Sequence, residues 1–415
     1  MVKEDYIVAV DIGSTKVVVI VGQIQEGITQ VVGFGKAQNS GLRRGTVVDV
    51  EETVSSISSA LEEAEKSAGV PLSRCFGSIS GNQIITVDSK GVIAVSRADG
   101  EIQPIDIERV IDAARSVALP PNYEILHINA KDFAVDGQTQ IKDPTGMSGI
   151  RLETNTHVIG VATIALKNLT RSLTQSGLTV DGIVFSALAA SKAYLSKKQK
   201  EIGAVLIDIG ASGTSIATFE EGTLIHSKFI PIGSNHITND IAIGLKITLE
   251  AAEKIKINEI SLDSDKINES AKVDLSKYDK NEKEQPSLKY VCEIAEARLG
   301  EIFSLIKQEL SDIERDEMLP AGAVLVGGGS KLDGIESFTK SRLGLPAQMG
   351  KPFMEISGIV DKLDDPGYAT AVGLLLWGLD ETQTNVSNRP RMNFQMGNLR
   401  GALDKLKELF KNFIP

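Results

Sequence analysis

The same short pattern occurs twice in this chain, once at the N-terminal end and once near the middle. The first copy is YIVAVDIGSTKVVVIVG, residues 6–22, and the second is GAVLIDIGASGTSIATF, residues 203–219. In each copy, two β-rich runs flank Asp-Ile-Gly and a few small or hydroxyl residues, which predicts a hairpin with a tight turn. Such a repeat predicts a duplicated α/β fold with a ligand cleft between its two halves.

The turns of both hairpins have the composition of a phosphate-binding nest. Backbone N–H groups and hydroxyls in such a turn attract phosphate, and an acidic residue at its edge can hold hydrated Mg²⁺. A third element, AVLVGGGSKLDGI at 323–335, runs from a buried strand into three glycines, where backbone can approach a ligand closely. Each element alone is also explained as a simple turn; the three together indicate a nucleotide site.

Composition limits the class of protein that surrounds this site. The chain has 415 residues, 42% of them hydrophobic, which is enough for several domains with real cores. Its net charge of −11 argues against general nucleic-acid binding. Two cysteines and four histidines form no paired disulfide or metal motif. The N-terminus has no signal-peptide layout and no apolar run is long enough to span a bilayer, which predicts a cytoplasmic protein.

The composition changes within each half of the chain. From Ile84 to Ile164, strand patterns, one helix and a stretch dense in Gly, Asp and Pro predict a small α+β subdomain inserted into the first half. In the second half, helical patterns at 234–257 and 288–310 bracket a polar span, 258–286. Its composition favours short strands and long loops of a further subdomain, with a disordered insertion as the alternative.

The C-terminal end has a character of its own. Residues 380–398 read as a flexible linker, and residues 399–415, LRGALDKLKELFKNFIP, have helical periodicity. A docked helix or a coiled-coil strand are alternatives for this tail. The long linker and the short length favour an amphipathic helix that binds a membrane interface, more strongly when several tails act together. Its apolar face comprises Leu399, Leu403, Leu406, Phe410 and Phe413.

These elements together resemble the actin-like ATPase superfamily, and nearly the whole chain resembles its FtsA family of bacterial cell-division proteins. The segments GLRRGTVVDVEE, FAVDGQTQIKDPTGMSGIRLE and DDPGYATAVGLLLWG look like signatures of that family. The resemblance implies an actin-like α/β fold with two lobes around a nucleotide cleft. The implied division is 1–83 with 165–199 and 360–379 (first core lobe), 84–164 (insertion), 200–233 with 311–359 (second core lobe), 234–310 (outer subdomain of the second lobe), 380–398 (linker) and 399–415 (membrane-targeting helix).

The resemblance also implies which residues bind ATP and Mg²⁺. Asp11 and Asp208 would hold Mg²⁺ through water, and Lys16 would reach a phosphate. Arg298 and Glu301 are candidates for the ribose side, with a surface charge pair as the alternative. The residues expected to cradle the phosphates are Gly13, Ser14, Thr15, Gly210, Gly213 and Thr214, and those expected to border adenosine are Gly327, Gly328 and Gly329.

One position departs from the pattern of active hydrolases in the superfamily. These enzymes place Glu, Asp or Gln at the start of the first connecting helix to orient the attacking water, whereas Ser186 stands at the matching position. Such positioning contributes ~10² to 10⁴ in rate, and a hydroxyl does it poorly. We therefore expect ATP binding with slow hydrolysis at most, and nucleotide that acts as a switch favouring head-to-tail filaments.

By resemblance, the protein would tether the FtsZ ring to the cytoplasmic face of the membrane at the division site and recruit later division proteins. The FtsZ C-terminal peptide would bind within 234–310. Three other functions compete with this one. A small-molecule kinase needs a catalytic carboxylate, and a DnaK-type chaperone needs a substrate-binding β domain after the ATPase. A PilM-like pilus-assembly adaptor shares the core and the insertion but lacks the amphipathic tail, so residues 399–415 discriminate.

Overall fold

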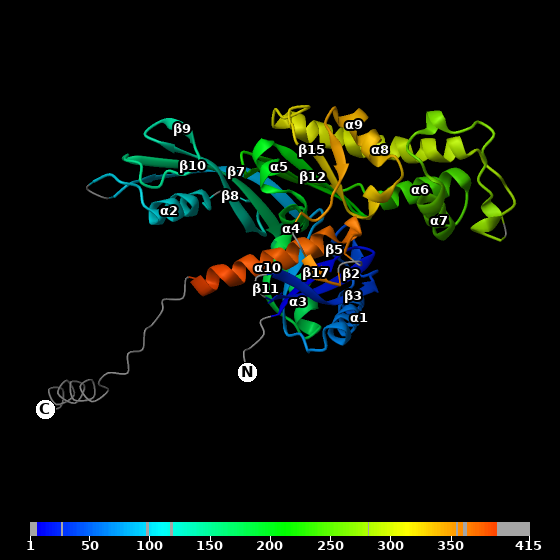
Figure 1. Ribbon diagram of the computed structural model, residues 1–415, viewed down its shortest axis with the longest axis horizontal. Helices are drawn as coiled ribbons and strands as arrows, with labels where there is room; N and C mark the ends of the chain where they lie inside the picture. The colour runs from blue at the N-terminus through cyan, green and yellow to red at the C-terminus, as the bar shows by residue number, and fades with distance from the viewer. Residues whose placement is uncertain are drawn as a thin grey trace. The chain divides into compact units, whose positions relative to one another are not determined.

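The two halves of the chain contain sheets with the same strand order. In the computed structural model, which describes residues 6–25, 28–96, 99–116, 119–280, 282–353, 356–359 and 363–387, the first sheet runs β11-β6-β1-β2-β3-β17 and the second β14-β13-β12-β15-β16. Read from β3 to β11 and from β14 to β16, each consists of three antiparallel strands followed by two parallel ones. The duplicated α/β fold is therefore confirmed (Figure 1).

The strands form where the sequence predicts the repeated hairpins. Continuous apolar runs suit central strands buried on both faces, and Val17 to Val21 are all fully buried. The first sheet contains β1 (Ile7–Ile12), β2 (Lys16–Gln25), β3 (Ile28–Gln38), β6 (Arg74–Ile79), β11 (Thr179–Phe185) and β17 (Ile356–Gly358). The second contains β12 (Ala204–Ile209), β13 (Thr214–Glu220), β14 (Thr223–Ile230), β15 (Gly322–Val326) and β16 (Ala347–Met349). A small hairpin joins β4 (Leu42–Arg43) to β5 (Thr46–Val47).

Helix α1 (Val50–Ala68) covers β2 and β3 of the first sheet. Its start is fixed by Asp49, whose carboxylate accepts a hydrogen bond from the backbone N–H of Glu52 at 3.0 Å. Gly35 lets the helix approach β3, because a Cβ at this position would lie 1.9 Å from the carbonyl oxygen of Ala60. Asp49 and Glu52 stand three positions apart, a spacing typical of helix starts, so this helix start has a local signal in the sequence.

Two connecting helices cross at the centre of the fold. They are α4 (Ser186–Tyr194), which is almost wholly buried, and α10 (Ala369–Ser387), which follows the short helical turn η5 (Pro366–Tyr368). A Cβ on Gly373 of α10 would lie 1.9 Å from the carbonyl oxygen of Ala189 in α4. The small residues of both helices thus serve backbone-to-backbone packing.

The inserted segment forms a four-stranded antiparallel sheet of order β7-β10-β8-β9, with one helix on it. Its elements are β7 (Ile84–Ala94), α2 (Pro104–Ala114), β8 (Tyr123–Val135), β9 (Gln138–Ile141) and β10 (Arg151–Ala162). It has a hydrophobic core of its own, which includes Ile102, Val110 and Leu152. This sheet also contacts β14 of the second sheet, where the imidazole Nε2 of His157 lies 2.9 Å from the buried Ser227 hydroxyl.

Residues 234–310 contain three helices, where the sequence predicts two helical regions. The first region, 234–257, divides into α6 (Ser234–Leu245) and α7 (Leu249–Glu259), because Lys246 takes a left-handed φ of 56° and the Thr248 hydroxyl caps the next helix. The second is α8 (Leu288–Asp312). Between α7 and α8 the chain forms loops with the short turns η1 (Ser264–Lys266) and η2 (Leu275–Lys277).

These loops are ordered by burial. Val273 and Leu275 are each 1% exposed and belong to the core of the second half. The prediction of long loops is confirmed. The predicted short strands are wrong, because only isolated bridges form in the described part of 258–286. The remaining helices of the fold are α3 (Thr163–Gln175), α5 (Lys197–Ile202) and α9 (Ile335–Leu343).

Near the C-terminal end, the structure differs from two of the predicted domain boundaries. Strand β17, which the sequence analysis places in the second lobe, pairs in parallel with β3 of the first sheet. Helix α10 continues to Ser387, so residues 380–387 of the predicted linker are helical. The rest of that linker and the predicted membrane helix 399–415, with Leu399 and Phe413 at its ends, lie outside the described residues. Among the described residues, no helix combines the length and apolar character needed to cross a membrane.

Candidate functional site

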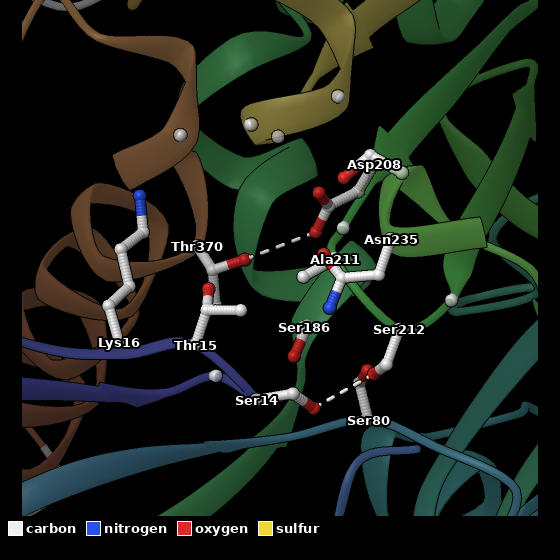
Figure 2. Close-up of a pocket in the computed structure, with 18 of the residues that line it drawn as sticks. Ser14, Thr15, Lys16, Ser80, Ser186, Asp208, Ala211, Ser212, Asn235 and Thr370 are labelled. Carbon is white, nitrogen blue, oxygen red and sulfur yellow. Dashed lines mark hydrogen bonds between the residues drawn. The ribbon is translucent and has the colours of Figure 1, made fainter. Parts of the chain in front are cut away.

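A cavity of about 680 Å³ lies where the two hairpin turns meet, within the usual size range of small-molecule sites. The Gly-rich loop after β15, helix α7 and the start of α10 complete its lining. Most of the predicted site residues are brought together here (Figure 2). They are Asp11, Gly13, Ser14, Thr15, Lys16, Ser186, Asp208, Gly210, Gly213, Gly327, Gly328 and Gly329.

The two hairpin turns have the same backbone geometry and face each other. In the first, the N–H of Gly13 donates to the carbonyl of Lys16 at 2.9 Å; in the second, Gly210 donates to Gly213 at 2.9 Å. The hydroxyls of Ser14 and Ser212 lie 2.8 Å apart across the cavity, as the dashed line in Figure 2 shows. Two small-residue turns in this arrangement present hydroxyls and backbone N–H groups to one ligand.

Two carboxylates line the same cavity and both carry a raised pKa. Burial raises the pKa of Asp11, although the Ser78 hydroxyl, which donates to Asp11 Oδ1 at 2.7 Å, and Lys16 partly offset this. Burial, followed by repulsion from Asp11, raises the pKa of Asp208 to about 7. Its main polar partner is Thr370, 3.4 Å away. A divalent cation would relieve the repulsion, so this donor set fits hydrated Mg²⁺.

Lys16 lies on the side of the cavity opposite Asp208 (Figure 2). Burial lowers the pKa of its ammonium group, and the negative charges of Asp11 and Asp365 partly counteract this. In the described part of the chain no carboxylate lies within 4.0 Å of Lys16 Nζ. A half-buried cation without an ion pair is suited to bind an anion that enters the cavity.

The three glycines after β15 (Gly327, Gly328 and Gly329) have two different roles. A Cβ on Gly327 would lie 2.3 Å from Asp208 Oδ1, and one on Gly329 would lie 2.4 Å from the Ile209 side chain. These two glycines let the loop, with its short turn η3 (Gly328–Lys331), pack against the end of β12. A Cβ on Gly328 would meet open space, so Gly328 is where the loop leaves most room for a ligand.

Three of the predicted site residues lie outside the cavity lining. Thr214 is fully buried, and its hydroxyl donates to the carbonyl of Ile232 at 2.8 Å. Arg298 donates from Nε to Asp240 at 2.6 Å and also pairs with Glu301. Arg298 and Glu301 therefore form a surface charge pair. This pair is the alternative to a ribose contact.

Helix α7 supplies an acid–base pair that the sequence analysis misses. Glu253 and Lys256 both line the cavity, and Lys256, only 6% exposed, donates to Glu253 Oε2 at 2.7 Å and to the Thr238 hydroxyl at 2.9 Å. A Glu and a Lys three residues apart on a helix are usually a solvated pair. The sequence offers no signal that Lys256 is buried or that the pair lines the cavity, because the break at Lys246 that directs α7 toward the cavity is not visible in the periodicity.

Ser186 lies at the N-terminus of α4 and lines the cavity as predicted. It is 7% exposed, and its hydroxyl donates to the carbonyl of Ile79 at 3.3 Å. The carboxylates that line the described cavity are Asp11, Asp208 and Glu253, which come from β1, β12 and α7. The first connecting helix therefore contributes a hydroxyl and no acid to this site.

Comparison with known proteins assigns the family. The family model described as Cell division protein FtsA matches residues 205–373, and the SHS2 domain inserted in FtsA matches residues 81–160. Cell division protein FtsA from Pseudomonas aeruginosa is 37% identical over 382 residues, 92% of this chain and 91% of that protein.

Two solved structures show the same fold at low sequence identity. The PilM–PilN type IV pilus biogenesis complex matches with a TM-score of 0.66 and 17% identity over 90% of this chain and 98% of that one. MreB5 of Spiroplasma citri bound to ADP matches with a TM-score of 0.55 and 13% identity, over 92% and 98%. With these matches, the duplicated sheets and the inserted subdomain, the chain belongs to the FtsA family of cell-division proteins and has the actin-like fold.

Proposed function

We propose that this cell-division protein binds ATP and Mg²⁺ in the cavity between its two halves. The observation that carries the proposal is the pair of matching turns, joined by Ser14 and Ser212, with Asp11 and Asp208 directly behind them. The turns would hold the phosphates, and the carboxylates would hold Mg²⁺ through water. The related fold of MreB5, solved with ADP, supports a nucleotide as the ligand.

For the ribose side we propose Glu253 and Lys256 in place of Arg298 and Glu301. The carboxylate of Glu253 lines the cavity and is 42% exposed in its side chain, so one oxygen can accept hydrogen bonds from ribose hydroxyls while the other contacts Lys256. The open side of Gly328 leaves room for the flat base. This assignment places ribose between α7 and the glycine loop.

We further propose that hydrolysis is slow and that the nucleotide acts mainly as a switch. The Ser186 hydroxyl is poorly suited to orient an attacking water and already donates to the Ile79 carbonyl. A ligand that contacts both turns favours the conformation in which the two halves are close. Such a closed form would favour head-to-tail filaments of identical subunits.

At the cellular level we propose that the chain tethers FtsZ to the cytoplasmic face of the membrane and recruits later division proteins. Helices α6 to α8 carry large apolar side chains at the surface, which suits a short peptide ligand. Ile243, Leu249 and Tyr290 are 76%, 58% and 48% exposed. Helices α6 and α8 meet at Gly244, where a Cβ would lie 2.7 Å from the Ile294 side chain. The amphipathic segment 399–415 would supply the membrane anchor.

We also propose the domain division that the sequence predicts, with residues 356–358 moved to the first core lobe because β17 pairs with β3. The insertion would keep the range 84–164, close to the 81–160 of the family match. A PilM-like adaptor role is the second candidate, since the PilM–PilN structure has the same fold. Of these two proposed functions, only the FtsA-type tether requires residues 399–415 to bind lipid.

Sedimentation with anionic liposomes tests the tether. The full chain is compared with a chain truncated after Asn398, each with MgATP and a peptide from the FtsZ C-terminus. We expect only the full chain to pellet and to carry the peptide with it. A Tyr290→Glu variant should still pellet but leave the peptide in solution, with Tyr123→Glu on the inserted segment as the matched control. Pelleting that survives truncation would reject the membrane anchor and favour the adaptor role.

A further inference from the structure

The ammonium group of Lys16 rests on an aromatic ring that comes from the far end of the chain. Lys16 Nζ lies 4.5 Å from the ring centroid of Tyr368, within the range of a cation–π interaction. Tyr368 belongs to η5, directly before α10, whereas Lys16 begins β2. The fold therefore brings residues 16 and 368 together at the phosphate end of the cavity.

Tyr368 is itself held on two sides by β3. The ring of Phe34 meets it edge-on at 5.4 Å, and the ammonium of Lys36 donates to the Tyr368 hydroxyl at 3.4 Å. Tyr368 is 9% exposed, so the ring has little freedom to move. A ring fixed in this way can define the position of the flexible Lys16 side chain.

Asp365, one of the two carboxylates whose charge acts on Lys16, is occupied by other groups. Asp365 accepts a hydrogen bond from the N–H of Gly367 at 2.8 Å and forms an ion pair with Lys331 at 2.9 Å. Gly367 leaves the space that the ammonium fills, because a Cβ at this position would lie 2.9 Å from Lys16 Nζ. Asp365 is thus paired with Lys331, and the ammonium of Lys16 lies against the ring.

We propose that Tyr368 is a positioning residue that holds the ammonium of Lys16 ready for the phosphates of a bound nucleotide. The inference rests on the proposed nucleotide site and adds to it a residue that itself need not contact the ligand. Holding the cation in place before binding reduces the ordering that binding requires. The effect is specific to phosphate, because Lys16 has no role in binding the base or the ribose.

The test compares ADP with adenosine by isothermal titration calorimetry in the presence of Mg²⁺, using the full chain. For Tyr368→Leu we expect the Kd for ADP to rise about tenfold, equivalent to about 1.4 kcal/mol, with the Kd for adenosine unchanged. Tyr368→Phe keeps the ring and should stay within about twofold of wild type for both ligands. Tyr368→Met replaces the Leu variant if the latter does not fold.

A double-mutant cycle separates positioning from general packing. In a Lys16→Met background, Tyr368→Leu should weaken ADP binding no further. Equal losses for ADP and adenosine, or a full tenfold loss that persists without Lys16, would show a merely structural role and overturn the inference. A wild-type chain that binds neither ADP nor ATP would instead refute the nucleotide site itself, so the two failures are distinguishable.

Discussion

At the scale of single residues, the cavity brings two carboxylates together at the place where we propose that a negatively charged nucleotide binds. Burial raises the pKa of both Asp11 and Asp208, and repulsion from Asp11 raises the pKa of Asp208 further. This arrangement costs stability whenever both are ionised, and it is a common trade-off at functional sites. Two substitutions test how the charge is used.

The first prediction concerns Asp208→Asn in the absence of nucleotide and Mg²⁺. The pKa of Asp208 is raised from 3.8 to about 7 in the folded chain, so its contribution to stability is full below pH 3.8 and is lost as the pH rises to about 7. Each unit of raised pKa corresponds to about 1.4 kcal/mol. The variant should therefore melt several degrees higher than wild type at pH 8, by thermal unfolding in EDTA.

The same variant should lose Mg²⁺-dependent ATP binding, because it lacks one of the two proposed carboxylates. Asp265→Asn, which removes an exposed carboxylate with the same change in net charge, is the control and should alter neither property. A lower melting temperature for Asp208→Asn at pH 8 would contradict the proposed electrostatic cost.

The second prediction separates the two alternatives for the ribose side. Glu253→Gln should weaken ATP binding about tenfold, since a hydrogen bond to a charged group contributes ~1.5–3 kcal/mol. Its effect on 2′,3′-dideoxy-ATP should be much smaller, because that ligand lacks both ribose hydroxyls. Glu301→Gln is the matched control and should leave both affinities unchanged. Calorimetry that finds Glu301 sensitive and Glu253 insensitive would restore the original assignment.

At the scale of elements, close approach of backbones decides where helices can lie. The crossing of α4 and α10 depends on Gly373, which faces the carbonyl oxygen of Ala189. Backbone at this contact has little room to move, since α4 is almost wholly buried. Glycines at such crossings therefore set the geometry between the two connecting helices.

The third prediction is that Gly373→Ala destabilises the fold by about 1–3 kcal/mol, the usual cost of overpacking a tight core. Gly300→Ala in α8 is the matched control: its nearest neighbour is a side-chain atom of Arg342 at 3.8 Å. Alanine there should be neutral or stabilise by roughly 0.5–1 kcal/mol. Urea unfolding of both variants measures the difference, and equal midpoints would contradict the prediction.

The elements that the sequence predicts well are those with local signals. The hairpins at Asp11 and Asp208 each depend on a few adjacent residues, and both form as predicted. The break between α6 and α7 depends on one left-handed residue, Lys246, which has no sequence signature. The pairing of β17 with β3 is set by tertiary contacts between segments more than three hundred residues apart.

The residues of the candidate site divide in the same way into those that the sequence predicts and those that it does not. Glycines and aspartates in the repeated turns are predictable because their chemistry requires those residue types. Glu253 and Lys256 are not, because their place in the cavity follows from the direction of α7. The predicted phosphate contact of Thr214 is absent for a geometric reason. Side chains alternate along β13, and the Thr214 hydroxyl points toward Ile232 and away from the cavity.

At the scale of the whole molecule, the inserted segment connects both halves of the fold. It leaves the first half between β6 and β11, and its His157 contacts Ser227 on β14 of the second half. Asp88 lies 3.1 Å from the other ring nitrogen, and burial lowers the pKa of His157. A neutral imidazole can then donate a hydrogen bond to Asp88 through Nδ1 and accept one from the Ser227 hydroxyl through Nε2.

The fourth prediction is that Ser227→Ala loosens this junction without affecting nucleotide affinity. Hydrogen exchange should become faster by about tenfold in the middle of β10 around His157 and in β14, while β1 and β12 keep their protection. Ser276→Ala, which changes an exposed serine in a loop of the second half, serves as the control. Unchanged exchange in Ser227→Ala would show that packing alone holds the junction.

The insertion is thus attached to both halves: the chain joins it to the first, and contacts with β14, among them the buried imidazole, join it to the second. A rigid body held at two places in this way would act as a lever. Any rotation of one half against the other must tilt it, or break the contact at Ser227. A small movement at the cavity would then become a larger displacement at its outer end, near α2 and β9. What binds at that end could sense whether the cavity is filled without touching it.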